Sequence, residues 1–418
     1  MKNYLNLFEF EKIIDIQKDL VNKNIIFLQG PMGYFFNDLS SYFFKKYKTN
    51  STHFIFNGGD LYFNKNKKNI LCKNNLKKNT TCILKYILEN NISSIFLFGD
   101  ERAIHKYLIN KIKKINKNIN IYVFEEGYIR PYYVTLEKNG VNANSNLFKK
   151  FNFNDLNLYE EMKLFKHPEH FSSRYYKMVY YASIYYLYMK IFKYKFKHYK
   201  HHRNPSPFYE LKYAFINIFK KLRNKIIEHK YLNFLKNDIK NNYIFFPLQV
   251  HDDFQLRSHS KFRNTENSIK YVLKLYKKYN CQEYLVIKHH LMDRGKKDYS
   301  KLIQDEIKKL NLNKEKIIYF YDVHLPTCIN NAKKCITVNS TVGLSSILSG
   351  KNTLFIGESI FNIKEFKINE EEFFKNKLKK FDNRKIKLLK YFIINKTQLN
   401  GSFYGMFPVE FEKEEMFI

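Results

Sequence analysis

The chain has 418 residues, a length that predicts two domains rather than one small core. Its formal net charge of +34 predicts attraction to anionic partners, whether nucleic acid, an anionic lipid surface or a phosphorylated substrate. The five cysteines form no CxxC pair and no paired metal spacing, which excludes the common cysteine-zinc motifs and fits free thiols in a reducing cytosol.

Neither secretion nor membrane insertion is expected. The N-terminal segment carries acidic residues and lacks an apolar core that ends in a cleavage site, so we expect no signal peptide. The longest uncharged apolar stretch in the middle of the chain, Met178–Met189, is shorter than the roughly 20 residues of a bilayer span. We therefore expect a protein that is not integral to a membrane.

The first part of the chain, residues 1–150, alternates apolar strand-like runs with helical stretches. We expect strands at Asn24–Gly30, Thr52–Asp60, Ser94–Asp100 and Ile119–Gly127, and helices at Tyr34–Lys48, Leu76–Leu88 and Glu101–Ile115. Strands that alternate with helices of this length predict βαβ units and a parallel sheet. Each predicted strand ends in a polar turn that contains glycine, where a ligand can approach the backbone closely.

Strand signals disappear in residues 151–241, where Tyr, Phe, Lys and His dominate. Pro205 and Pro207 break this segment into two helical pieces. Two interpretations stay open. The segment is either a surface element with aromatic rings at a lipid interface and cations at anionic headgroups, or a tyrosine-rich pair of core helices with a solvated basic face.

The alternation resumes in residues 242–395. We expect strands at Tyr243–Gln249, Glu283–His290, Lys316–Asp322, Cys335–Ser340 and Asn352–Gly357, and helices near Asn267–Tyr279, near Tyr299–Leu310 and from Thr341. Residues 396–418 are expected to form a tail that packs back on the N-terminal domain. The predicted fold class is therefore α/β, with two parallel-sheet domains and a helical insert between them.

Three polar clusters follow apolar strand-like runs in this second domain. They are His251, Asp252 and Asp253; Lys288, His289 and His290; and Asn339, Ser340 and Thr341. Because open α/β sheets bind ligands at the carboxyl ends of their strands, we expect these clusters to share one edge. This placement is the main indication in the sequence that the protein is an enzyme.

Each cluster has a chemical and a structural interpretation. An aspartate after a strand can act as a nucleophile or general base, or it can stabilise a turn. A histidine there can bind a phosphate or protonate a leaving group, or belong to a solvated basic turn. Ser340 and Thr341 at a helix start can bind an anion or only cap the helix.

The N-terminal domain offers weaker signals. Glu125 and Glu126 provide a further pair of carboxylates, or a simple turn. The segment Gln29–Gly33 has neither the GxGxxG nor the GK[ST] pattern, so neither dinucleotide nor nucleoside triphosphate binding is predicted. The basic run His198–Arg203 is interpreted as a solvated face or a contact to lipid phosphates. No metal site and no cofactor are predicted, because no third ligand stands at a recognisable spacing.

Ten segments, taken in order, resemble the capsular polysaccharide biosynthesis/export proteins of the KpsS/LipB type, which are β-Kdo glycosyltransferases of Gram-negative bacteria. The segments are FLQGPMGYFF, FNGGD, LFGDER, VFEEGYIRP, YKHHR, PLQVHDDFQ, KHHLMDRG, YDVHLPT, VNSTVGLSS and TQLNGSFY, from about Asn24 to Tyr404. The resemblance implies a GT-B-like pair of Rossmann domains. It also implies CMP-β-Kdo as donor and a lysophosphatidylglycerol acceptor, in a reaction that begins the poly-Kdo linker of a capsule chain.

The resemblance also implies roles for individual residues. The candidate catalytic residues are Asp252 and Asp253, one of them as nucleophile, together with His251 and Glu126; the candidate contacts to CMP are Gln249, Lys288, His289, His290, Asn339, Ser340 and Thr341; and the candidate contacts to the acceptor or sugar are Gly30, Asp60, Glu125 and Arg130. Leu291 stands where the family has proline, which is expected to loosen the turn after His290.

The expected setting is the cytoplasmic surface of the inner membrane, where the protein is peripheral. Its expected partners are the lipid acceptor, the transferase that extends poly-Kdo and the capsule ABC transporter. Two alternatives stay open, another GT-B enzyme that uses a different CMP- or UDP-sugar and a non-catalytic export scaffold. Nucleic-acid binding is not expected, because no RRM, OB, KH or helix-turn-helix pattern is present.

Overall fold

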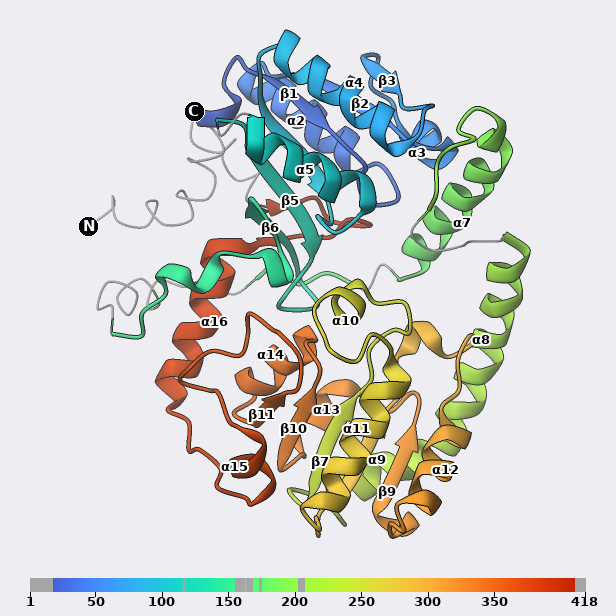
Figure 1. The fold of residues 1–418 in the computed structure, drawn as a ribbon, viewed down its shortest axis with the longest axis vertical. Helices are drawn as coiled ribbons and strands as arrows, with labels where there is room; N and C mark the ends of the chain where they lie inside the picture. Colours follow the sequence, from blue (N-terminus) through green and yellow to red (C-terminus); the bar gives the residue numbers. More distant parts are fainter. Residues whose placement is uncertain are drawn as a thin grey trace. The chain divides into compact units, whose positions relative to one another are not determined.

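The chain forms two compact units in a computed structural model, which describes residues 18–115, 118–154, 162, 168–172, 175–201 and 207–409. The first unit contains Met1–Pro207 together with Tyr391–Ile418, and the second contains Phe208–Lys390 (Figure 1). Three segments that carry predictions lie outside the described residues. They are residues 1–17, where we expect no signal peptide; residues 202–206, which include His202, Arg203 and Pro205; and residues 410–418 of the predicted tail.

The first unit is built on a seven-stranded sheet with the order β12-β6-β5-β4-β1-β2-β3. Its strands are β1 (Asn24–Phe27), β2 (Asn50–Ile55), β3 (Asn69–Leu71), β4 (Ile92–Phe98), β5 (Asn120–Glu126), β6 (Tyr133–Lys138) and β12 (Gln398–Asn400). Strands β1 to β5 pair in parallel, and β6 and β12 extend the sheet antiparallel at one edge.

Helices cover both faces of this sheet. The helices of this unit are α2 (Phe35–Tyr47), α3 (Gly58–Phe63), α4 (Leu76–Glu89), α5 (Ala103–Ile115) and α7 (Tyr175–Ile191), with short 3-10 turns at Asn142–Asn144, Leu147–Lys150 and Phe192–Tyr194. Because neighbouring strand residues point to opposite faces, Ile26 of β1 packs with α4 and α5 whereas Phe27 packs with α2. Continuous apolar strands are therefore buried on both sides.

The second unit is built on a five-stranded parallel sheet with the order β11-β10-β7-β8-β9. Its strands are β7 (Tyr243–Pro247), β8 (Tyr284–Lys288), β9 (Ile317–Phe320), β10 (Lys334–Thr337) and β11 (Asn352–Phe355). Its helices are α8 (Pro207–Ile227), α9 (His229–Lys236), α10 (Phe254–Ser258), α11 (Thr265–Lys278), α12 (Ser300–Lys309), α13 (Leu325–Asn330), α14 (Thr341–Leu348) and α15 (Glu370–Phe374), with 3-10 turns at Leu291–Asp293 and Lys314–Lys316.

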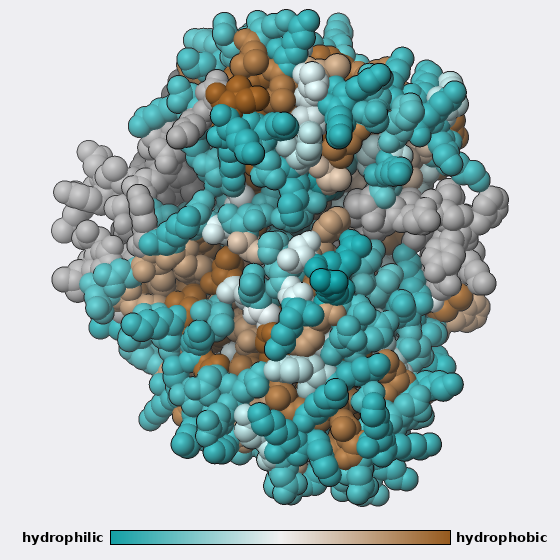
Figure 2. Space-filling view, viewed as in Figure 1, coloured by the Kyte–Doolittle hydropathy of each residue, from teal (hydrophilic) through white to brown (hydrophobic). Residues whose placement is uncertain are grey.

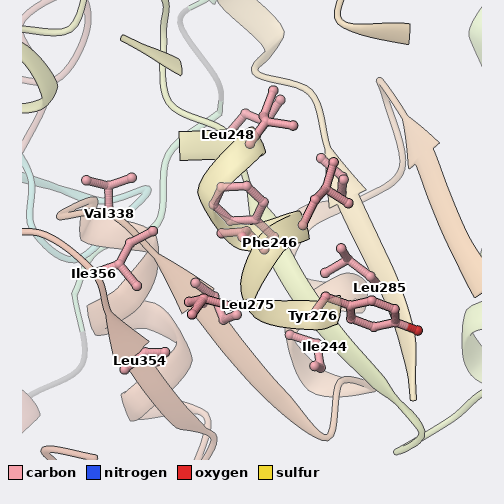
Figure 3. Packing of buried hydrophobic residues seen from close by; sticks show 14 of the residues in the cluster. Ile244, Phe246, Leu248, Leu275, Tyr276, Leu285, Val338, Leu354 and Ile356 are labelled. Carbon is pink, nitrogen blue, oxygen red and sulfur yellow. The ribbon is translucent and has the colours of Figure 1, made fainter. Parts of the chain in front are cut away.

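The core of the second unit is also double-sided. Ile244, Phe246 and Leu248 pack toward α11 on one face, as Figure 3 shows for this cluster. Tyr243 and Phe245 pack toward α9 and α13 on the other face. Helix α16 (Asn383–Thr397) leads from the second unit back into β12 of the first. Because the five strands are parallel, their carboxyl ends meet at one edge of the sheet.

The predicted α/β class with two sheet domains is confirmed, since the expected strands and helices form in both units. The second sheet is wholly parallel, whereas β6 and β12 add antiparallel strands to the first. The segment 151–241 is divided between the units, α7 lying in the first and α8 and α9 in the second. Within the described part of the chain, no helix combines the length and the apolar composition that a bilayer crossing requires.

Candidate active site

Hydrogen bonds join two of the predicted polar clusters at the carboxyl edge of the second sheet. Gln249, which follows β7, donates from Nε2 to Asp253 Oδ2 at 3.1 Å and to Asn339 Oδ1 at 3.0 Å. The backbone N–H of Asn339 donates back to Gln249 Oε1 at 3.3 Å. Gln249 and Asn339 are buried. The segment after β7 and the start of α14 are therefore held together as one structure.

The two adjacent aspartates have different tasks in this structure. Asp253 is the N-cap of α10, where its Oδ1 accepts from the backbone N–H of Gln255 at 2.8 Å. Since Oδ2 accepts from Gln249, both oxygens of Asp253 are used to hold the loop. Asp252 is half-buried beside it and is not the residue that caps α10.

His251 forms a dyad with a buried carboxylate. Its backbone N–H donates to Asp293 Oδ2 at 2.7 Å, and its Nδ1 lies 2.6 Å from Asp293 Oδ1. The side chain of Asp293 is 1% exposed and that of His251 is 29% exposed. Burial raises the pKa of Asp293, and the hydrogen bonds from His251 act against that increase. A carboxylate that holds Nδ1 orients the imidazole for proton transfer through Nε2.

Lys288 and His289 lie in the interior of the unit rather than at its surface. The Nζ of Lys288 donates to the carbonyl oxygen of Tyr321 at 2.8 Å, and burial lowers the pKa of this amine. His289 is 1% exposed, and its Nδ1 lies 2.7 Å from the hydroxyl of Tyr319. Burial lowers the pKa of His289 to about 4, so its imidazole is neutral at pH 7.

His290 is the member of this cluster that reaches the surface. It is half-buried, and its Nδ1 accepts from the backbone N–H of Met292 at 3.2 Å, which caps the 3-10 turn Leu291–Asp293. A closed turn therefore forms with leucine at position 291. This turn delivers Asp293 to His251.

The third cluster begins helix α14. Ser340 is its N-cap, and the Ser340 hydroxyl accepts from the backbone N–H of Val342 at 3.2 Å. A Cβ at Gly343 would lie 2.4 Å from the ring of Phe355, so this helix packs on β11 more closely than an alanine would allow. Thr341 is the first helical residue. The exposed N–H groups of such a helix start favour an anion.

The predicted residues of the first unit gather at the carboxyl ends of β1, β2 and β5. Asp60, in α3, accepts from Gln29 Nε2 at 3.1 Å and from the Tyr185 hydroxyl at 2.8 Å. Burial raises the pKa of Asp60. A cavity of about 40 Å³ lined by Gln29, Gly30 and Asp60 has room for a water molecule. Asp60 therefore links α7 to the sheet.

Glu125 and Glu126 end β5 nearby. Glu125 Oε1 accepts from the backbone N–H of Glu126 at 3.0 Å. Burial raises the pKa of Glu125 to about 7, and the nearby charge of Arg102 acts in the opposite direction. Arg102 also donates from Nη1 to the carbonyl oxygen of Gly30 at 3.3 Å. Arg102 therefore lies among the predicted acceptor-side residues.

Arg130 is placed by its own turn. Its Nε donates to the carbonyl oxygen of Gly127 at 3.1 Å, and the Arg130–Pro131 peptide bond is cis. A Cβ at Gly127 would lie 2.1 Å from the carbonyl oxygen of Tyr133. Only glycine fits there, which explains the glycine of the FEEG segment.

Sequence reasoning missed two residues, Asp293 and Arg102. Asp293 belongs to KHHLMDRG and Arg102 to LFGDER, two of the segments that resemble the family. Neither residue was among the polar clusters that the sequence indicated as functional. Their roles depend on which loops meet at the sheet edge. Among the described residues, no three His, Cys, Asp or Glu side chains gather closely enough to hold a metal ion.

A cavity in the second unit lies beside the predicted active-site residues rather than among them. Its volume is about 1040 Å³, and it runs along β9 between α9 and α12. Tyr319 and Tyr321 line it and also contact the ring of His289. The cavity contains none of the acids at the ends of β7 and β8.

The chain belongs to a family described as capsule polysaccharide biosynthesis proteins, whose model matches residues 93–404. It is 31% identical to the capsule polysaccharide export protein KpsS of Escherichia coli, over 92% of this chain and 98% of that protein. It is also 31% identical to the capsule polysaccharide modification protein LipB of Neisseria meningitidis serogroup B, over 92% of each chain.

A comparison with solved structures finds a beta Kdo 2,7 transferase, KpsC of Thermosulfurimonas dismutans. It is 14% identical and aligns over 87% of this chain and 89% of that chain, with a TM-score of 0.44.

Proposed function

We propose that this protein is a retaining glycosyltransferase that moves Kdo from CMP-β-Kdo to a lysophosphatidylglycerol acceptor and so begins the poly-Kdo linker of a capsular polysaccharide. Family membership and the capsule-related relatives that match nearly the whole chain support a role in making the capsule. The identities of donor and acceptor are the implication of the resemblance in the ten sequence segments.

One observation carries the proposal. An acid, an oriented imidazole and a helix N-terminus meet at the carboxyl edge of one sheet, where Gln249 joins the loop after β7 to the loop after β10. Such an edge is where α/β units bind ligands. This combination suits a retaining transfer from a nucleotide sugar, because the phosphate needs hydrogen-bond donors and a double displacement at the anomeric carbon needs a nearby carboxylate.

We assign the nucleophile to Asp252, because both oxygens of Asp253 are used by Gln249 and by the cap of α10. In the first step the bond from the anomeric carbon to the CMP oxygen breaks, its electron pair leaves with CMP, and Asp252 bonds to that carbon. In the second step the acceptor hydroxyl attacks and displaces Asp252. Two inversions at one carbon give retention.

The dyad of His251 and Asp293 provides the base for the second step. The acceptor hydroxyl must lose a proton as it attacks, and an imidazole held through Nδ1 can take it on Nε2. The N–H groups at the start of α14, with Ser340 and Thr341, are the proposed contacts to the CMP phosphate. Lys288 and His289 are buried behind this edge, and the half-buried His290 is the proposed histidine contact to the nucleotide.

On the first unit, Glu125, Glu126, Gly30, Asp60 and Arg130 remain the proposed contacts to the acceptor or to the sugar. Arg102 joins this set, because its guanidinium suits the carboxylate of Kdo or the phosphate of the lipid. The proposed setting is the cytoplasmic surface of the inner membrane, with the poly-Kdo-extending transferase and the capsule transporter as partners.

The test is a transfer assay with purified full-length protein, CMP-Kdo generated in situ and a fluorescent lysophosphatidylglycerol. We expect a lipid product that carries one Kdo and an equal amount of released CMP. Parallel reactions with other CMP-sugars and with UDP-sugars separate this activity from that of a related transferase. Absence of product with every donor, under conditions where a known relative is active, would favour a non-catalytic export scaffold instead.

A further inference from the structure

Helix α8 is amphipathic in the opposite sense to an ordinary surface helix. Among its described side chains, Phe219, Leu222 and Ile226 are 72%, 59% and 79% exposed. Asn224, by contrast, is 2% exposed. With 3.6 residues in each turn, the three apolar residues share one face and Asn224 lies on the opposite one. The apolar face of α8 therefore points to solvent and its polar face points inward.

Hydrogen bonds to the body of the second unit fix this orientation. Asn224 Nδ2 donates to Asp322 Oδ2 at 2.8 Å, and Asn217 Oδ1 accepts from Arg294 Nη1 at 2.5 Å. Directly after α8, Glu228 accepts from the backbone N–H groups of Tyr321 at 2.8 Å and Asp322 at 2.6 Å. The helix cannot rotate to bury its apolar face without leaving these buried polar groups unpaired, which is costly.

An exposed, contiguous apolar stripe on a helix indicates a binding surface. The residues on both sides of this stripe indicate what it binds. Lys225 lies on one side and Arg223 on the other, both exposed. An apolar stripe between cations is the pattern of helices that lie in the interface of an anionic bilayer, where the apolar side chains enter the acyl boundary and the cations meet the headgroups.

We propose that the outer face of α8, formed by Phe219, Leu222 and Ile226 with Arg223 and Lys225 beside them, docks the protein onto an anionic lipid surface. Figure 2 shows apolar side chains at the margin of the molecule where Figure 1 labels α8. The proposed docking surface does not include α7, the other exposed aromatic helix of the segment 151–241. Helix α7 packs on α3 in the first unit.

Docking through this face brings the proposed active site close to the lipid surface. The inward face of α8 contacts Arg294, the neighbour of Asp293 in the turn that holds His251. The site would then stand at the surface that supplies a lipid acceptor. This last consequence rests on the proposed function, whereas binding of α8 to lipid does not.

The test is flotation of full-length protein with vesicles of phosphatidylcholine alone or of phosphatidylcholine with phosphatidylglycerol. The variant is Phe219→Ser/Leu222→Ser/Ile226→Ser. The matched control, Phe44→Ser/Leu88→Ser/Ile115→Ser, removes the same three residue types from helices of the first unit, where they are 58%, 55% and 56% exposed. Melting temperatures confirm that both variants fold.

We expect wild-type protein and the control to float with the vesicles that contain phosphatidylglycerol, and the α8 variant to bind them at least about tenfold more weakly. Transfer to an acceptor dispersed in detergent is expected to be equal in all three proteins. Equal vesicle binding by all three would overturn the proposal. A second outcome would also overturn it: the wild type is a dimer that does not bind vesicles, and the α8 variant is a monomer. The outer face of α8 would then bind protein rather than lipid. Loss of transfer in all three proteins with vesicle binding as expected would contradict only the proposed function.

Discussion

Asp252 and Asp253 are adjacent in sequence but have different surroundings. Because both oxygens of Asp253 hold the loop, we expect Asp253→Asn to keep the cap of α10 and a measurable rate. Asp252→Asn removes the proposed nucleophile and should lower kcat by roughly 10³-fold or more, with little change in melting temperature. Steady-state kinetics with CMP-Kdo decide between them. A larger loss in the Asp253 variant would reverse the assignment.

Asp293 is predicted to act through His251 as a positioning residue. Asp293→Asn should lower kcat at least about tenfold while the KM for CMP-Kdo stays close to that of the wild type, because the imidazole loses its orientation and the donor site is untouched. In a double-mutant cycle, adding Asp293→Asn to His251→Asn should cost little more activity than His251→Asn alone. Additive losses would mean that the two side chains act separately.

Glu137 gives the first unit a pH dependence that stability measurements can detect. It is buried, it accepts from the Tyr128 hydroxyl at 2.5 Å and bonds to Ser145, and burial raises its pKa to about 7. A folded pKa above the unfolded value stabilises the protein fully below about pH 4.5, and this contribution is lost as the pH rises through 7.

The free energy of unfolding of the wild type, relative to that of Glu137→Gln, should therefore fall by up to roughly 3 kcal/mol between pH 4.5 and pH 8. Urea unfolding of both proteins across this range provides the measurement. A difference that does not change with pH would show that Glu137 is ionised throughout.

The sequence was sufficient to predict which residues stand at strand ends, but not which of them are exposed. Lys288 is the last residue of β8, a strand covered on both faces. The backbone N–H of His289 continues the ladder by donating to the carbonyl oxygen of Phe320 in β9 at 2.8 Å, so the chain passes beyond the strand with its side chains still enclosed. Asp293 and Arg102 could not be predicted, because their partners come from other loops.

At the scale of elements, helix α7 is held in the first unit by its contact with α3. A Cβ at Gly58 would lie 2.1 Å from the carbonyl oxygen of Tyr188, which is backbone and cannot move aside as a side chain could. We expect Gly58→Ala to lower the free energy of unfolding by about 1–3 kcal/mol. Ser183→Ala, at an exposed position of α7, is the control and should have little effect. Equal stability of the two variants would show that α7 is not packed in this way.

The elements that sequence periodicity predicted are those with long apolar runs. The three-residue strands β3 and β12 were not predicted, because so short a run has no measurable period and because β12 pairs with a strand distant in the chain. The six-residue antiparallel strand β6 was also not predicted. Gln398 of β12 illustrates this dependence, since its Oε1 accepts from the backbone N–H of Tyr128 at 2.9 Å. The inverted amphipathicity of α8 also required the structure, which shows which of its faces is inward.

At the scale of the whole molecule, each unit has its own set of candidate functional residues at the carboxyl edge of its sheet. The edge of the second unit has the acid, the dyad and the start of α14, and the edge of the first has Glu125 and Arg102. The formal charge of +34 is consistent with the proposed substrates and the proposed binding surface, which are all anionic: a nucleotide sugar, a phospholipid and a bilayer. We therefore expect one chain to bind both the donor and the acceptor.

The most direct measurement of the central claim is the anomeric configuration of the product, determined by NMR after transfer from CMP-β-Kdo to lysophosphatidylglycerol by the full-length protein. We predict a single β-linked Kdo, formed by the wild type and formed roughly 10³-fold or more slowly by Asp252→Asn. An α-linked product, or a β-linked product formed at an unchanged rate by the Asp252 variant, would contradict retention through this carboxylate.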